Sequence, residues 1–351
     1  MGLKGITESA LSAVLQQLRD ERLLSHEAGG ISRRQLARDL ECSVQLQTVY
    51  GFPVQTIPLP TSAGDMDWDA VHPGAVLNFL AARVPEFGTV LKARLAECPC
   101  SPSNPWSLIY YCDEASAGNL LHIDPARKSW LFYWSFLEMG HLLSYDSCWF
   151  LGGVLRYQRA AQVAGGFTTI FRRHLQMFFG EDSSFKDHGF SVHCADGTVI
   201  MLWARLKVTL ADEAAMKAMW SLKGSAGTRP CAQCANVVNH RAGLDLSDAD
   251  VLVSSKCSDT RRFVKHTNES LWRSAEMVSR PGLSVKAREE LETQLGVKHA
   301  PESVLMDPAL RTVARPAECI TYDPMHCLLC NGALGIELYL FLEKKADSLD
   351  F

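Results

Sequence analysis

Apolar residues recur along this chain at two spacings, which separate a helical beginning from a mixed remainder. Over residues 8–24 they fall three or four positions apart, which predicts an amphipathic helix. Residues 31–51 predict a plain helical segment that also fits the middle of a helix-turn-helix. A Pro-, Gly- and Asp-rich stretch over 53–73 precedes a third predicted helix over 75–96. We therefore expect a helical N-terminal region over residues 1–100.

The spacing changes after residue 100 to one typical of strands. Three aromatic-rich runs at 106–114, 128–139 and 148–157 alternate with turn-rich connections and predict three successive strands. Residues 165–180 then carry a helical apolar face that ends at a glycine. Residues 190–210 predict a hairpin whose second half runs on toward Asp212. The predicted order is three strands, a helix and a strand.

The rest of the chain predicts helices around an irregular stretch. Helical spacing returns at 214–224 and 284–296, and the last residues, 323–345, also predict a helix. Between them, residues 231–280 are irregular and rich in cysteine and charge. The fold class expected from this order is α/β, or more broadly α+β.

Composition limits what the protein can bind. Its 35 basic and 39 acidic residues give a net charge of −4, so any contact with a polyanion must come from local patches. One such patch holds Arg156, Arg159, Arg172 and Arg173 with no acid between 147 and 180; a second lies over 256–273, and either patch also fits an ordinary solvated surface. The longest apolar run, 328–342, falls short of the ~20 residues that cross a bilayer, so we expect no membrane partner. The 12 cysteines then suggest intracellular thiols and metal ligands.

Two carboxylates follow predicted strands. Asp113 comes after the apolar run 108–112, and Asp212 comes after 206–210. Two acids at neighbouring strand ends repel each other unless a hard cation neutralises them, so they predict a Mg²⁺ or Mn²⁺ site. An Asp after a strand is also a common turn residue, and this alternative stays open.

Cys231 and Cys234 form a C-x-x-C loop that can present two thiolates to one Zn²⁺. Their Pro-Cys-x-x-Cys sequence also matches half of a zinc deaminase motif, but its other half is far too distant in the chain. A zinc ion needs further ligands. The candidates are His240, Cys257, Cys319, His326, Cys327 and Cys330, with Asp323 a weaker one.

Taken together, YYCDEASAGN, the strand and helix order, the C-x-x-C after Asp212 and YDPMHCLLCNG resemble the DDE/D transposases of the CACTA-like and Plavaka-like group. The resemblance covers roughly residues 105–345. It implies a ribonuclease-H-like mixed sheet with flanking helices and a zinc-knuckle insertion. The implied divisions are a first part of the core over 101–215, the insertion over 216–318 and a last part of the core over 319–351.

The resemblance also implies roles for single residues. Asp113 and Asp212 are the first two catalytic acids, Cys231 and Cys234 form the zinc knuckle, and Asp323 with His326 forms a D-x-x-H element. The third acid is Glu337, or Glu343 on the same helix, or it was lost by truncation.

The activity that the resemblance implies is cleavage of DNA at transposon ends and transfer to target DNA. It would use two Mg²⁺ or Mn²⁺ ions, a structural Zn²⁺ and no covalent intermediate. The implied partners are transposon-end and target DNA and a second copy in a homodimer. The implied location is the nucleus; without the resemblance we expect the cytoplasm. The alternative is an inactive zinc-stabilised module, derived from a transposase, that binds DNA or protein.

Overall fold

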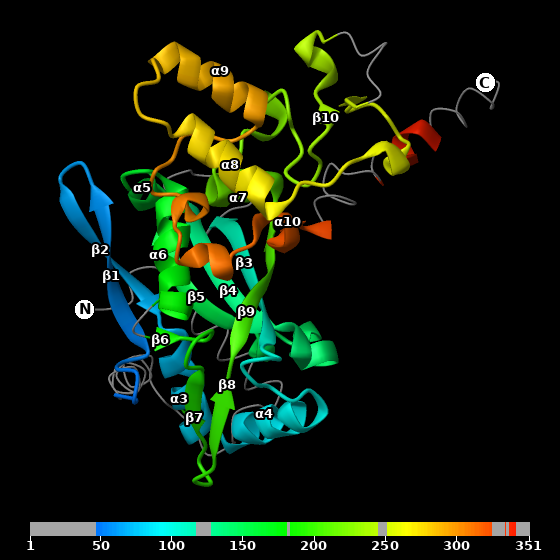
Figure 1. Ribbon diagram of the computed structural model, residues 1–351. Helices are drawn as coiled ribbons and strands as arrows, with labels where there is room; N and C mark the ends of the chain where they lie inside the picture. The colour runs from blue at the N-terminus through cyan, green and yellow to red at the C-terminus, as the bar shows by residue number, and fades with distance from the viewer. Residues whose placement is uncertain are drawn as a thin grey trace, which may run out of the picture.

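The computed structural model describes residues 47–116, 128–180, 183–244, 251–324, 334 and 337–341. The predicted helices over 8–24 and 31–51 lie outside these ranges. The strands, labelled as in Figure 1, are β1 (Val54–Thr61), β2 (Gly64–Val71), β3 (Trp106–Ser116), β4 (Lys128–Phe136), β5 (Phe150–Arg156), β6 (Ser183–Ser184), β7 (Phe190–His193), β8 (Val199–Leu202), β9 (Ala204–Ala211), β10 (Val237–Val238), β11 (Val253–Ser254) and β12 (Ile320–Tyr322). The helices are α3 (Pro73–Arg83), α4 (Pro85–Glu97), α5 (Tyr157–Ala160), α6 (Phe167–Phe179), α7 (Glu213–Trp220), α8 (Asn268–Val278), α9 (Val285–Leu295) and α10 (Pro316–Cys319).

A mixed sheet of seven strands, in the order β1-β2-β5-β4-β3-β9-β12, forms the centre of the molecule (Figure 1). Strands β1, β2, β5, β4 and β3 pair antiparallel along this order, whereas β9 and β12 run parallel to β3. The three aromatic runs became β3, β4 and β5, followed by helix α6 and strand β9. This part of the prediction, and the α+β class, are confirmed.

Helix α6 covers one face of the sheet and builds the core there. The Tyr110 hydroxyl of β3 lies 2.7 Å from Nδ1 of His174 on α6, and both residues are fully buried. Phe178 packs edge-on against Trp134 of β4, one turn further along α6. Side chains alternate between the faces of a strand, so Tyr111 and Asp113 lie on the opposite, half-exposed face.

Strands β1 and β2 are the clearest departure from the sequence prediction. The Pro-, Gly- and Asp-rich stretch predicts a connection in a helical region, but it forms an antiparallel hairpin that joins the main sheet through Ala70 and Gly153. Pro58 and Pro60 are compatible with this strand because β1 lies at the edge of the sheet, where a missing N–H breaks no ladder bond. The domain boundary near residue 100 stays a prediction.

Three further predictions needed correction at the level of elements. The single helix over 75–96 is two helices, α3 and α4, because Pro85 lacks the N–H that a continuous helix needs and begins α4 instead. The predicted hairpin over 190–210 is limited to β7 and β8, which form their own two-stranded sheet. The irregular stretch contains a regular helix, α8, which begins with a capping box between Thr267 and Ser270.

The chain between β9 and β12 forms a separate layer of helices and loops. It lies at the end of the sheet where β9 ends, at the top of Figure 1. The predicted helices over 214–224 and 284–296 are confirmed as α7 and α9 within it. None of the helices in the described ranges is long and apolar enough to cross a membrane.

Candidate functional site

Three adjacent parallel strands bring three aspartates to one edge of the sheet. In the pairing of β3 with β9, Tyr111 is opposite Leu210, and Asp113 and Asp212 each come two residues later. In the pairing of β12 with β9, Tyr322 is opposite Ala211, and Asp323 comes next. The Asp323 N–H donates to the Ala211 carbonyl at 3.0 Å, which extends this pairing to the aspartate itself. Because neighbouring strands lie about 4.8 Å apart, we expect the backbone of Asp212 to be about one strand spacing from that of Asp113 and from that of Asp323, which lie on either side of it.

Asp113 lies within β3, three residues before its end, and not directly after the strand as the sequence predicts. Its carboxylate is held from two sides. The Tyr111 hydroxyl donates to Oδ2 at 3.0 Å, and the Glu114 N–H donates to Oδ1 at 2.7 Å. Since each carboxylate oxygen has two lone pairs, both oxygens can still accept another partner.

Asp212 has a structural role that the sequence left open. It is the N-cap of α7, and its Oδ1 accepts a hydrogen bond from the Ala215 N–H at 2.7 Å. This is the local interaction that favours Asp directly before a helix. The cap uses one oxygen, so the role as cap and a role as cation ligand are compatible.

Neighbouring pKa values reflect the negative charge at this edge. The pKa of Tyr111 is raised, chiefly by burial, and further by the charges of Asp113 and Asp323 and by the hydrogen bond to Asp113. Burial also raises the pKa of the Cys112 thiol, to which Asp113 and Asp212 add. Each of the three aspartates thus raises the pKa of Tyr111, of Cys112 or of both, as expected from the strand register.

The carboxylates fit a hard cation, but the described residues do not form a complete cage. No group of three or more His, Cys, Asp or Glu side chains within the described ranges could hold a metal ion. Mg²⁺ commonly binds through one or two protein carboxylates and completes its octahedron with water and substrate phosphates. A pair such as Asp113 and Asp212 therefore suits Mg²⁺ bound together with a phosphate substrate better than a resident ion.

Glu337 does not join this edge. It is exposed in a short helical stretch, 337–341, whose side chains Leu338, Tyr339 and Phe341 are also more than half exposed. This stretch lies apart from β3 and β9 in Figure 1. Glu343 lies outside the described residues.

The two cysteines of the C-x-x-C loop lie together. Burial raises the pKa of Cys234 to about 11, and the hydrogen bond and the charge of Cys231 add to this effect. A bound Zn²⁺ would deprotonate both thiols and so reverse this state. The loop also touches the sheet, because Nε2 of Gln233 donates to the Ile320 carbonyl of β12 at 2.9 Å. The C-x-x-C loop is thus anchored beside β12, the strand directly before Asp323.

The other candidate zinc ligands divide into three groups. Cys319 is buried and its thiol lies 3.2 Å from the Leu206 carbonyl, which is the environment of a core cysteine. His240 hydrogen-bonds Ser255, and the Cys257 thiol contacts the Asp259 carbonyl. His326, Cys327 and Cys330 lie outside the described residues.

Residues of the two basic patches predicted from the sequence have different interactions in the structure. Arg172 forms ion pairs with Glu302 and Asp307, which fasten α6 to the layer between β9 and β12. Arg261 pairs with Asp259 at the surface. Lys265, by contrast, lines the pocket described below.

Sequence reasoning missed the alignment of Asp323 with the first two acids. The signal was available, because Ile320, Thr321 and Tyr322 are a β-branched and aromatic run directly before an Asp. Neither a scan against protein-family models nor a search of curated proteins finds a match for this chain.

Proposed function

We propose that this protein is a transposase-like enzyme that cleaves and transfers DNA strands with the help of divalent metal ions. The observation that carries the proposal is the register of three neighbouring parallel strands, which places Asp113 near the end of β3 in line with Asp212 and Asp323, directly after β9 and β12. The sequence predicts that Asp113 and Asp212 lie at neighbouring strand ends, and the register adds Asp323 to them, which supports the proposal.

The order of elements supports a ribonuclease-H-like core. Counted from β3, Asp113 lies on the first strand of the core. Asp212 follows β9, the fourth strand when only the strands of the main sheet are counted from β3. These are the positions that the family gives to its first two acids.

In this proposal the protein residues bind and orient the cations. Asp113 and Asp212 supply one carboxylate each, and Tyr111 and the Glu114 N–H fix the orientation of Asp113. Asp323 adds a third carboxylate to the same row. The bound Mg²⁺ or Mn²⁺ would lower the pKa of the attacking hydroxyl and neutralise charge on the phosphate.

A structural zinc site completes the proposal. Cys231 and Cys234 would provide two ligands, and the resemblance adds His326, which lies outside the described residues, as a third. The C-x-x-C loop contacts β12 through Gln233. Four protein ligands would leave no open position, so such a zinc would connect the insertion to the core and take no part in cleavage.

One observation favours the alternative, an inactive module that binds DNA or protein. Glu337, the third acid implied by the resemblance, is exposed. In this alternative the strand-end carboxylates only cap and hydrogen-bond their neighbours.

Nicking of a supercoiled plasmid in Mn²⁺, which needs no particular end sequence, tests the proposal. Asp113→Asn should abolish nicking and leave the thermal midpoint nearly unchanged, because Asn is similar in size and still accepts at Oδ1. Asp65→Asn, at the exposed start of β2, removes the same charge and should keep wild-type activity. Nicking that survives Asp113→Asn would refute the catalytic assignment, and wild-type protein that binds DNA without nicking it would support the binding module.

The same assay separates the candidates for the third acid. Asp323→Asn should lower nicking strongly if Asp323 belongs to the metal site. Glu337→Gln should then have little effect, and the reverse result would return the third role to Glu337.

A further inference from the structure

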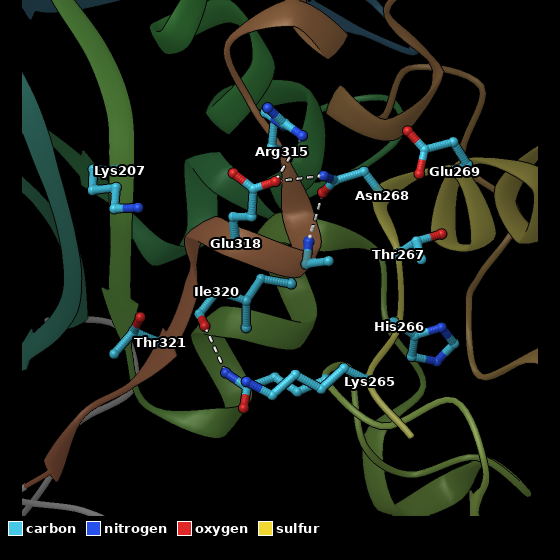
Figure 2. A pocket seen from close by; sticks show the side chains of 12 residues that line it. Lys207, Lys265, His266, Thr267, Asn268, Glu269, Arg315, Glu318, Ile320 and Thr321 are labelled. Carbon is cyan, nitrogen blue, oxygen red and sulfur yellow. Dashed lines mark hydrogen bonds and ion pairs between the residues drawn. The ribbon is translucent and has the colours of Figure 1, made fainter. Parts of the chain in front are cut away.

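A pocket of about 610 Å³ opens beside β12, at the free edge of the main sheet (Figure 2). Four parts of the chain line it. Lys207 comes from β9, Gln233 comes from the C-x-x-C loop, and residues 265–269 come from the loop before α8 and its first turn. The rest come from α10, the residue before it and β12, namely Arg315, Ala317, Glu318, Ile320 and Thr321. The pocket is thus a junction between the sheet and the layer that follows β9.

Two of the residues that line the pocket are lysines. Lys207 and Lys265 are exposed, and within the described parts of the chain neither forms an ion pair. In Figure 2 they approach from different sides, one from β9 and one from the loop before α8. Two separated ammonium groups on one hollow favour an extended anion over a single small ion.

The acids in the pocket only partly oppose this charge. Glu318 is committed to Arg315 at 2.7 Å, and its Oε1 also accepts from Nδ2 of Asn268 at 3.0 Å. Glu269 remains as the one lining acid without such a pair in the described residues. It lies in the first turn of α8, where the positive end of the helix dipole partly offsets its charge.

The position of the pocket relates it to the row of aspartates. Thr321 lines the pocket and Asp323 comes two residues later, which is about 7 Å along a strand. Successive nucleotides rise about 3.4 Å along one DNA strand, so this separation corresponds to about two nucleotides. A DNA strand bound in the pocket could therefore extend along β12 to the aspartates at the ends of the strands.

We propose that the pocket between β12 and the first turn of α8 holds the sugar–phosphate backbone of DNA next to the scissile position, through Lys207 and Lys265. The proposal rests on the proposed function for its choice of DNA as the ligand. It adds a binding surface that the sequence motifs do not indicate, since only Lys265 belongs to a basic cluster of the sequence.

The test is the salt dependence of binding between the full chain and a short fluorescein-labelled DNA duplex, followed by fluorescence anisotropy. The slope of log affinity against log salt is negative. Lys207→Gln combined with Lys265→Gln should make this slope shallower by about 1.8, because each lost phosphate contact contributes about 0.9 to its magnitude. Lys286→Gln combined with Lys298→Gln is the matched control, because both lysines are exposed outside this pocket and the net charge changes equally. The control slope should stay close to that of the wild type.

A change of opposite sign guards against a simple folding defect. Glu269→Gln removes the one opposing charge and should tighten DNA binding, a gain that a damaged fold would not produce. A pocket double variant whose slope equals that of the control pair would overturn the proposal, and so would wild-type protein that does not bind the duplex.

The results also separate this proposal from the proposed function. If the pocket variants alter the salt slope but wild-type protein does not nick DNA, the pocket stands and cleavage fails. If nicking depends on Asp113 while the pocket variants bind like the control pair, cleavage stands and the pocket fails.

Discussion

Asp212 gives the sharpest test of the site, because two roles of its carboxylate can be separated by the choice of substitution. Its Oδ1 accepts the Ala215 N–H at 2.7 Å and so caps α7. Asn caps a helix about as well as Asp, whereas Ala cannot accept the bond, and loss of such a cap costs about 1 kcal/mol. Only Asp carries the negative charge that a cation needs.

The expected magnitudes follow from this geometry. Asp212→Ala should lower the free energy of unfolding by about 1 kcal/mol, or roughly 2 °C in the thermal midpoint of a chain of this size. Asp212→Asn loses an attraction to the α7 dipole of about 0.5 kcal/mol but also a repulsion from the neighbouring aspartates, so its stability should stay within about 0.5 kcal/mol of wild type. Both variants should lose Mn²⁺-dependent nicking.

Urea unfolding and plasmid nicking, measured on the same preparations, check these values. If Asp212→Asn retains nicking, the residue is only a helix cap and the metal assignment is wrong. If Asp212→Ala is as stable as Asp212→Asn, the capping bond is not formed in solution and the orientation argued for this carboxylate is lost.

Three further predictions concern the core and the knuckle. Gly152→Ala should destabilise the protein by about 1–3 kcal/mol, because a Cβ there would lie 2.5 Å from Cε1 of buried His174. The same change at Gly88, inside α4, meets nothing closer than 3.4 Å and should stabilise the protein by up to about 1 kcal/mol. Equal urea midpoints for the two variants would contradict the packing described for these glycines. Burial lowers the pKa of His72 to about 4 and of His174 to about 3. Below pH 6.5 the unfolded chain therefore binds more protons than the folded protein, and the free energy of unfolding should fall by up to about 1.4 kcal/mol per pH unit for each histidine as the pH falls toward 4. A urea midpoint that stays level over this range would contradict this prediction. Cys231→Ser should lower the zinc content of purified protein, measured by atomic absorption, and equal zinc in wild type and variant would exclude the knuckle as a ligand.

The sequence by itself determined the local elements of the core. The runs 106–114, 128–139 and 148–157 contain the strands β3, β4 and β5, and 167–179 is a helix, because their apolar spacing suits those structures wherever they pack. It also identified Asp113 and Asp212, since each follows an apolar run of strand length. Local spacing failed at 54–71, where an edge position makes prolines acceptable in a strand, and at α8, whose capping residues stand in a charged and irregular stretch.

Only the tertiary structure decided which strands are neighbours. Pairing of β3 with β9 and of β9 with β12 joins segments about a hundred residues apart. The backbone hydrogen bonds of this pairing do not depend on the spacing of apolar residues, so that spacing does not identify the partner strand. This pairing brings Asp323 into line with the first two acids, and among the described residues it makes β12 the last strand of the sheet, beside the pocket of Lys207 and Lys265. Residue types in the sequence therefore identify candidate site residues, whereas the parallel register determines which of these residues are neighbours. This register depends on contacts that form only when the whole sheet is assembled.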